Sequence, residues 1–223
     1  ATRAPRRSDV FVTVEEAVSR IRAGKMLIVV DEAERENEGD VVFAAEKATP
    51  ALVNFAVKHG RGILCAPMEP EVADRLELSL MVSRNTARYG TPFTESVDVR
   101  HGTTTGTSVF DRTPTLRALA NPKIRSEDLD RPGHVFPLRA LPGGVLRRAG
   151  HSEAVPDLCA LAGLRPVGAL CEILRPNGEM MRLPEVERYA HKHKPGILTI
   201  QDLIAYRRGR ETLIKRVVSV PLP

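Results

Sequence analysis

The chain alternates between short apolar runs and longer segments in which apolar residues recur every three or four positions. Two aliphatic runs, at 26–30 and 41–45, predict buried strands. Thr13 and Glu16 form a capping box, and the apolar residues that follow keep helical spacing as far as Gly24. The same patterns predict further strands at 62–66, 93–99, 135–139 and 167–174, and further helices at 51–58, 71–76, 112–120, 151–163, 184–193 and 199–208. Helices and strands that alternate without a clear linker favour one α/β or α+β domain.

The bulk composition of the 223 residues is that of a globular protein, with 42% apolar and 27% charged residues. Aromatic residues make up only 4% and Trp is absent, so we expect an aliphatic core. No apolar run approaches the roughly 20 residues that a membrane helix needs, so we expect no membrane association. Residues 1–12 are basic and lack an apolar stretch, which predicts a flexible arm rather than a secretory signal.

The net charge of +5 is spread along the chain and is not interleaved with aromatic residues. This pattern argues against a nucleic-acid surface and favours small anions as ligands. Cys65, Cys159 and Cys171 are widely spaced and lie in apolar segments, which predicts buried free thiols rather than disulfides or a zinc site. A reducing, cytoplasmic setting fits these cysteines best.

The segment DEAERENEGD, at 31–40, places six carboxylates between the first two predicted strands. Carboxylates this close repel one another unless a cation or protons intervene. The segment is therefore either a solvated turn, as charge runs usually are, or a site that holds a cation. Arg35 lies inside it and could orient a carboxylate or bind an anionic substrate.

A second candidate site is LRRAGHSEA, at 146–154, where a helix is predicted to begin. A helix amino terminus offers unpaired N–H groups and partial positive charge, and two arginines lie just upstream. The segment is either a phosphate site or an ordinary helix start capped by Ser152. Three weaker signals accompany it: His134 after Pro-Gly, Glu172 inside an apolar strand, and the Gly/Thr-rich loop 102–108.

The order of these motifs resembles one enzyme family. RENEGD, TTTGTS followed by DR, RPGHVFPLRA, GGVLRRAGHSEA and LCEI occur here as in 3,4-dihydroxy-2-butanone 4-phosphate synthase, over residues 14 to 208. The resemblance implies a single α+β domain at 13–209, built as three α-β-α layers with a mixed central sheet. Residues 210–223 resemble the linker and the start of a fused GTP cyclohydrolase II domain in bifunctional members.

The resemblance also implies an activity, which is conversion of D-ribulose 5-phosphate to L-3,4-dihydroxy-2-butanone 4-phosphate and formate in riboflavin biosynthesis. The implied cofactor is Mg²⁺ or Mn²⁺, with Glu36 and His151 as its ligands. The implied catalytic residues are His134, Glu172, Glu38 and Asp40. The implied substrate-binding residues are Arg35, Glu36, Asp40, Thr105, Arg148, Ala149, Gly150, His151, Ser152 and Glu172.

Members of this family are homodimers whose active sites draw residues from both subunits. We therefore expect a homodimer with shared sites, in which His151 and the phosphate-binding segment reach the partner's acidic loop. Three alternatives remain open: a metal-dependent aldolase or isomerase of a pentose phosphate, a basic RNA-binding protein, and a domain kept only for dimerisation.

Overall fold

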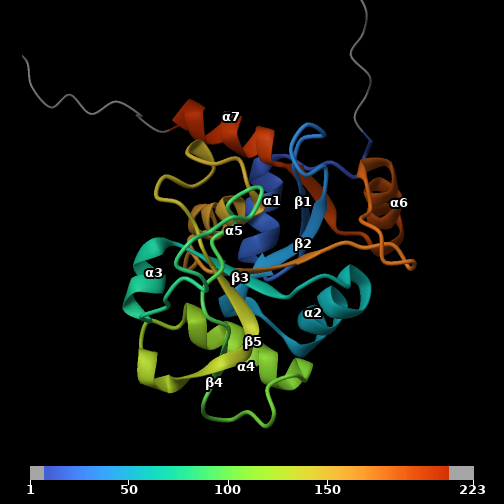
Figure 1. Cartoon of the computed structure of the whole chain (residues 1–223). Helices are drawn as coiled ribbons and strands as arrows, with labels where there is room; N and C mark the ends of the chain where they lie inside the picture. The colour runs from blue at the N-terminus through green and yellow to red at the C-terminus, as the bar shows by residue number, and fades with distance from the viewer. Residues whose placement is uncertain (1–7, 211–223) are drawn as a thin grey trace, which may run out of the picture.

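The computed structural model describes residues 8–210, in which seven strands form one mixed sheet (Figure 1). The strands are β1 (Leu27–Val30), β2 (Gly39–Ala44), β3 (Cys65–Met68), β4 (Val97–Val99), β5 (Leu129–Arg139), β6 (Gly168–Glu172) and β7 (Gly196–Thr199). Their order across the sheet is β4-β5-β3-β6-β2-β1-β7. Strand β1 pairs in parallel with β7, and β3 with β5, while the other neighbours are antiparallel.

Helices cover both faces of this sheet (Figure 1). They are α1 (Val14–Arg22), α2 (Pro50–Phe55), α3 (Pro70–Arg75), α4 (Val109–Ala120), α5 (His151–Leu161), α6 (Leu183–His193) and α7 (Ile200–Arg210). One aliphatic core forms between the sheet and α1, α5 and α7, and the other between the sheet and α2, α3, α4 and α6. Alternate residues of β1 enter different cores, Leu27 one and Ile28 the other, because side chains of a strand point to opposite faces. The predicted α+β fold of three layers is therefore confirmed.

The centre of the sheet brings the candidate residues together. Strands β1 and β2 form an antiparallel hairpin in which Val29 lies opposite Asp40, and Asp40 lies opposite Glu172 of β6. Helix α5 packs against β3 and β6. The acidic loop that joins β1 to β2 and the first turn of α5 thus lie at the same end of the sheet.

Most predicted elements are present with shifted ends. The strand expected at 62–66 begins only at Cys65, and the one expected at 93–99 covers only Val97–Val99. Strand β5 begins at Leu129 rather than 135, because its first half pairs with the short strand β4 and alternates between buried and exposed residues. No apolar run marks such a half-buried segment in the sequence.

The flexible arm predicted for residues 1–12 is wrong for its last part. The backbone N–H of Ile197 donates to the carbonyl of Val10 at 2.8 Å, and that of Val12 donates to the carbonyl of Ile197 at 2.9 Å. Strand β7 ends the sheet, so its free backbone groups can pair with this extended segment. Residues 1–7 lie outside the described residues, and so do 211–223, where the linker and the second domain were predicted.

Cys65, Cys159 and Cys171 are buried free thiols, as predicted. Within residues 8–210, no helix combines the length and the apolar character that crossing a membrane requires.

Candidate active site

The acidic loop is organised by its first carboxylate, that of Asp31. One oxygen, Oδ2, accepts hydrogen bonds from Nη1 of Arg35 and from the backbone N–H of Glu36, both at 2.9 Å. The other oxygen, Oδ1, accepts from the backbone N–H of Glu38 at 2.8 Å. Asn37 completes the turn with a φ of 56°, a left-handed conformation that Asn adopts more readily than most residues. The loop is therefore folded around a buried acid and is not a simple solvated turn.

The start of α5 is shaped by a close approach of Gly150 to Arg148. Gly150 is the N-cap, and a Cβ atom at that position would collide with the Arg148 guanidinium. Ser152 lies in the first turn with its side chain buried, so the alternative of a helix capped by Ser152 is wrong. The guanidinium is held from two sides, because Nη1 donates to Oε2 of Glu153 at 2.6 Å and Nη2 donates to the carbonyl of Tyr89 at 3.0 Å.

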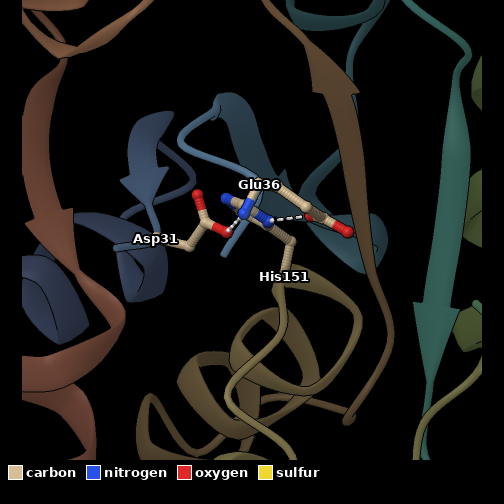
Figure 2. A group of neighbouring side chains, drawn as sticks. All are labelled: Asp31, Glu36 and His151. Carbon is tan, nitrogen blue, oxygen red and sulfur yellow. Dashed lines mark hydrogen bonds and ion pairs between the residues drawn. The ribbon is translucent and has the colours of Figure 1, made fainter. Parts of the chain in front are cut away.

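The acidic loop and the start of α5 meet within one chain. Figure 2 shows Asp31 and Glu36 from the loop and His151 from α5 pointing toward one another. Nδ1 of His151 lies 3.6 Å from Oε2 of Glu36, and the closest ligand atoms of the three residues all lie within 4.8 Å of one another. Two segments that are far apart in the sequence therefore form one cluster of metal-ligating side chains.

Burial and mutual charge change the proton affinities in this cluster. Burial alone would lower the pKa of His151, but the carboxylates of Asp40, Glu36 and Asp31 raise it to about 9. Burial, together with the charges of Glu172, Glu38 and Glu36, raises the pKa of Asp40 to about 7 despite the opposing effect of His151. The carboxylates therefore favour a proton on the His151 imidazole, and a divalent cation bound among them would displace that proton. The carboxyl group of Asp40 can exchange a proton near neutral pH.

Two further acids of the loop, Glu36 and Glu38, have pKa values shifted in opposite directions. Burial and the neighbouring Glu36 raise the pKa of Glu38. Burial also acts to raise the pKa of Glu36, but contacts with His151 and Arg35 outweigh it and leave the pKa lowered. Glu36 is thus held as a carboxylate, which is the form that ligates a metal.

These residues line one cavity, which encloses about 530 Å³ including its open mouth. Its lining contains eight of the predicted site residues: Arg35, Glu36, Glu38, Asp40, Arg148, His151, Ser152 and Glu172. Ala149 and Gly150 join Arg148 to His151 at its edge. Glu172 also accepts a hydrogen bond from the backbone N–H of Ile63 at 2.7 Å, which fixes its carboxylate at the end of β6.

Two predicted residues, Thr105 and His134, do not line this cavity. His134 is exposed, and its Nδ1 lies 2.6 Å from Oδ2 of Asp98. Thr105 is also exposed, and a Cβ atom on the next residue, Gly106, would collide with His134. The Thr/Gly loop and the RPGH segment therefore meet each other, but outside the cavity of their own chain.

One expectation about the subunits is wrong. His151 was expected to reach the acidic loop of a partner, whereas it contacts Glu36 of its own chain. The antiparallel pairing of β2 with β6, and the packing of α5 against β3 and β6, already bring the two segments together. No partner is needed for that contact.

Several residues of the site were missed by the sequence analysis. They are Asp31, Cys65, Tyr89, Thr91, Phe93 and Glu153. Glu153 lies in the first turn of α5, five residues after Arg148, a spacing that predicts no helical side-chain pair. Tyr89 and Thr91 lie in a stretch rich in Thr, Ser, Gly and Asn, where periodicity gives no signal. Phe93 was predicted only as the first residue of a strand.

The donor set of the cluster fits a divalent cation. Among the described residues, Nε2 of His151 and Oδ1 of Asp40 are buried side-chain atoms without a hydrogen-bond partner. Such orphaned atoms are costly unless a ligand satisfies them. Carboxylate oxygens suit Mg²⁺, and an imidazole nitrogen also suits Mn²⁺ and Zn²⁺. Asp31 is a weaker candidate as a ligand, because both its oxygens already accept hydrogen bonds.

Comparisons with known proteins agree with this geometry. The family described as 3,4-dihydroxy-2-butanone 4-phosphate synthase matches residues 15–206. The riboflavin biosynthesis protein RibBA of Aquifex aeolicus is 53% identical over 215 residues, which cover 96% of this chain and 53% of the relative. The chain thus spans about half the length of the curated relatives it matches.

Solved structures give the same result. A crystal structure of 3,4-dihydroxy-2-butanone 4-phosphate synthase in complex with two magnesium ions has a TM-score of 0.86 and 39% identity, covering 90% of this chain and 98% of that one. RibBX from A. baumannii, described as a two-domain synthase of the same name, has a TM-score of 0.89 and 43% identity, covering 93% of this chain and 61% of that one.

Proposed function

Because this chain belongs to the 3,4-dihydroxy-2-butanone 4-phosphate synthase family, we propose that it converts D-ribulose 5-phosphate to L-3,4-dihydroxy-2-butanone 4-phosphate and formate, a step of riboflavin biosynthesis. The observation that carries the proposal is the cavity in which Glu36 and His151 face each other beside Arg148. A sugar phosphate needs both a cation site for its oxygens and an anion site for its phosphate, and this cavity offers the two side by side.

Glu36 and His151 would hold the divalent metal, Mg²⁺ or Mn²⁺. Glu36 is kept ionised by its neighbours, and the unpartnered Nε2 of His151 is available to a ligand. The related structure with two magnesium ions supports Mg²⁺. When bound, such an ion polarises the carbonyl and hydroxyl oxygens of a sugar and stabilises negative charge on them.

The phosphate would bind at the start of α5. Arg148 contributes a guanidinium that is already ordered by Glu153 and Tyr89, and Gly150 allows its close approach to the helix. The first N–H groups of a helix, here those of His151 and Ser152, favour anions. Arg35, which lines the cavity from the acidic loop, would orient the sugar hydroxyls or the phosphate.

Proton transfer would fall to the acids beside the metal ligands. The reaction enolises the sugar, removes a hydroxyl, rearranges the carbon skeleton and releases formate, so several protons must move in sequence. Asp40 and Glu38 have raised pKa values and lie in the cavity, which suits groups that accept and return protons. Glu172, directly opposite Asp40 in the sheet, would take part in proton transfer together with Asp40 and Glu38.

We also propose a homodimer in which a second copy supplies His134 and Thr105 to each cavity. The support is their position: both are exposed and adjacent, and neither lines the cavity of its own chain. Glu36→Gln and His134→Ala variants would then each be inactive alone. In a mixture allowed to exchange subunits, about half of the dimers contain one subunit of each variant, and one of the two sites in such a dimer is intact. The mixture would therefore regain about a quarter of the wild-type activity. No recovery on mixing would contradict a shared site.

The reaction itself is tested by incubating the chain with ribulose 5-phosphate and measuring formate with a coupled dehydrogenase. We expect formate release that EDTA abolishes and that Mg²⁺ or Mn²⁺ restores. A metal-dependent aldolase or isomerase would consume the sugar without producing formate. Absence of formate with every divalent ion tried would therefore refute the proposed function.

A further inference from the structure

The loop at 83–96 lies at the mouth of the cavity. Thr91 and Phe93 line the cavity, while residues 83–88 are exposed. The loop closes on itself, because Nδ2 of Asn85 donates to the carbonyl of Thr91 at 3.0 Å and Oδ1 of Asn85 accepts from the N–H of Ala87 at 2.9 Å. The tip that these bonds shape presents one aromatic side chain, that of Tyr89, toward the site.

Tyr89 contacts the acidic loop in two ways. Its hydroxyl donates a hydrogen bond to the backbone carbonyl of Arg35 at 2.7 Å. The Arg35 guanidinium lies over the aromatic ring, with Cζ 5.5 Å from the ring centroid, at a distance where a cation–π attraction operates. The main chain and the side chain of Arg35 are therefore both held by the same tyrosine.

Tyr89 also contacts the phosphate side of the cavity. Its backbone carbonyl accepts a hydrogen bond from Nη2 of Arg148 at 3.0 Å, while Nη1 of Arg148 is held by the fully buried Glu153. A single residue thus connects the two arginines that line the cavity from different elements, one in the β1–β2 loop and one before α5.

We propose that Tyr89 is a positioning residue that fixes Arg35 and Arg148 relative to each other for binding of a sugar phosphate. The inference rests on the proposed function, which assigns both arginines to ribulose 5-phosphate. A free arginine side chain loses rotamer freedom when it binds an anion, and a partner that orders it beforehand reduces that cost. Tyr89 does not touch the reacting atoms in this arrangement, and it acts through the arginines.

Two variants separate the two side-chain contacts of Tyr89 with Arg35, and both keep the backbone carbonyl that accepts from Arg148. Tyr89→Phe removes only the bond to the Arg35 carbonyl and keeps the ring, whereas Tyr89→Ala removes both. Arg84→Ala is the matched control, since Arg84 is exposed in the same loop. Urea unfolding of each variant verifies that the fold is intact. The first measurement is the Kd for ribulose 5-phosphate, by calorimetry in EDTA, so that no turnover interferes.

We expect the Kd to increase from wild type to Tyr89→Phe to Tyr89→Ala, by about 2- to 10-fold for the first step, which is the range for loss of one neutral hydrogen bond. In the metal-loaded enzyme the KM should rise in the same order while kcat changes little, as expected for lost substrate binding. Tyr89→Phe should keep part of the affinity for ribulose 5-phosphate that Tyr89→Ala loses. Arg84→Ala should have the Kd and KM of the wild type.

The proposal is overturned if Tyr89→Ala binds as tightly as Arg84→Ala, or if kcat falls while Kd and KM stay unchanged. The latter result would mark an interaction made only in the transition state rather than the positioning of arginines for binding. If the wild type binds ribulose 5-phosphate without releasing formate, the proposed reaction fails and the Kd series still decides the role of Tyr89. If the wild type binds this sugar phosphate neither in EDTA nor with Mg²⁺ or Mn²⁺, both proposals fail.

Discussion

Nδ1 of His151 lies 3.6 Å from Oε2 of Glu36, so the start of α5 and the acidic loop are in direct contact inside a single chain. The contact offsets part of the negative charge of the acidic loop and lowers the pKa of Glu36, which keeps this side chain ionised. It also places a carboxylate oxygen and an imidazole nitrogen close enough to bind the same ion. This pair decides whether the cavity is a metal centre, and it can be tested directly.

We expect Glu36→Gln to weaken Mn²⁺ binding at least about 10-fold, since removing even an outer partner of a metal ligand commonly costs that much. Electron paramagnetic resonance of free Mn²⁺ gives the Kd without any turnover. The matched control is Glu34→Gln, which changes an exposed acid of the same loop and should leave the Kd unchanged. Equal affinities of the two variants would show that the ion binds elsewhere.

Asp31 should matter through the backbone of the acidic loop. Its side chain is 1% exposed and accepts from Arg35 and from two backbone N–H groups. Asp31→Asn replaces one acceptor oxygen by a donor, so at least one buried N–H loses its partner, at a cost of about 1–3 kcal/mol in the free energy of unfolding.

Two measurements check this prediction. Urea unfolding gives the stability loss, and the Mn²⁺ titration should show weaker binding because Glu36 is no longer held in place. Glu32→Gln, at the next and exposed position, serves as the control. If Asp31 ligates the ion without organising the loop, Asp31→Asn will weaken metal binding and leave the unfolding curve unchanged.

The fold was largely predictable because both faces of the central strands are buried, which leaves uninterrupted aliphatic runs in β1 and β2. The half-buried start of β5 was not, since it carries no such run. For the site, charge density and residue type identified Glu36 and His151 as candidates, and the family resemblance gave them roles.

The rest of the site depends on contacts that no spacing encodes. Asp31 acts through main-chain N–H groups five and seven residues away, and this requires the particular turn at Asn37. Tyr89 reaches the cavity from a loop without periodicity. The position of His134 outside the cavity follows from the pairing of β5 with β4, which lies at the far edge of the sheet from β7.

Asp111 gives a prediction about pH. Hydrogen bonds from the backbone and hydroxyl of Thr104, with others from Ser108 and Gly106, lower the pKa of the Asp111 carboxyl. A carboxyl group with a lowered pKa in the folded state stabilises the protein above its unfolded pKa of about 3.9, and this stabilisation is lost as the pH falls through the folded value. The stability advantage of wild type over Asp111→Asn should therefore be full at pH 7 and should shrink below about pH 4.

Urea unfolding at pH 7, 5, 4 and 3 measures this difference. Asp130→Asn is the comparison, because Asp130 is exposed and pairs with the exposed Arg100, and its effect should stay within about 0.5 kcal/mol. A difference between wild type and Asp111→Asn that is constant across this range would show that the charge of Asp111 does not stabilise the Thr/Gly loop.

The buried pair of Arg148 and Glu153 gives a prediction about stability. Their side chains are 16% and 0% exposed, and their contact is 2.6 Å long. Removing one partner of a buried pair leaves the other charge uncompensated, so Glu153→Ala should lower the free energy of unfolding by about 3–5 kcal/mol. The exposed pair of Glu16 and Arg20 is the control, and Glu16→Ala should cost less than about 1 kcal/mol.

A double-mutant cycle separates the charge from the packing. Arg148→Met with Glu153→Gln removes both charges while keeping most of the volume, so the double variant should be more stable than Glu153→Gln alone. It should still fail to bind ribulose 5-phosphate, because the guanidinium proposed for the phosphate is gone. A double variant as unstable as the sum of the two single ones would show that Arg148 and Glu153 contribute independently. Glu153 would then stabilise α5 through the N–H of Leu141, from which its Oε1 accepts at 3.2 Å, rather than by holding Arg148.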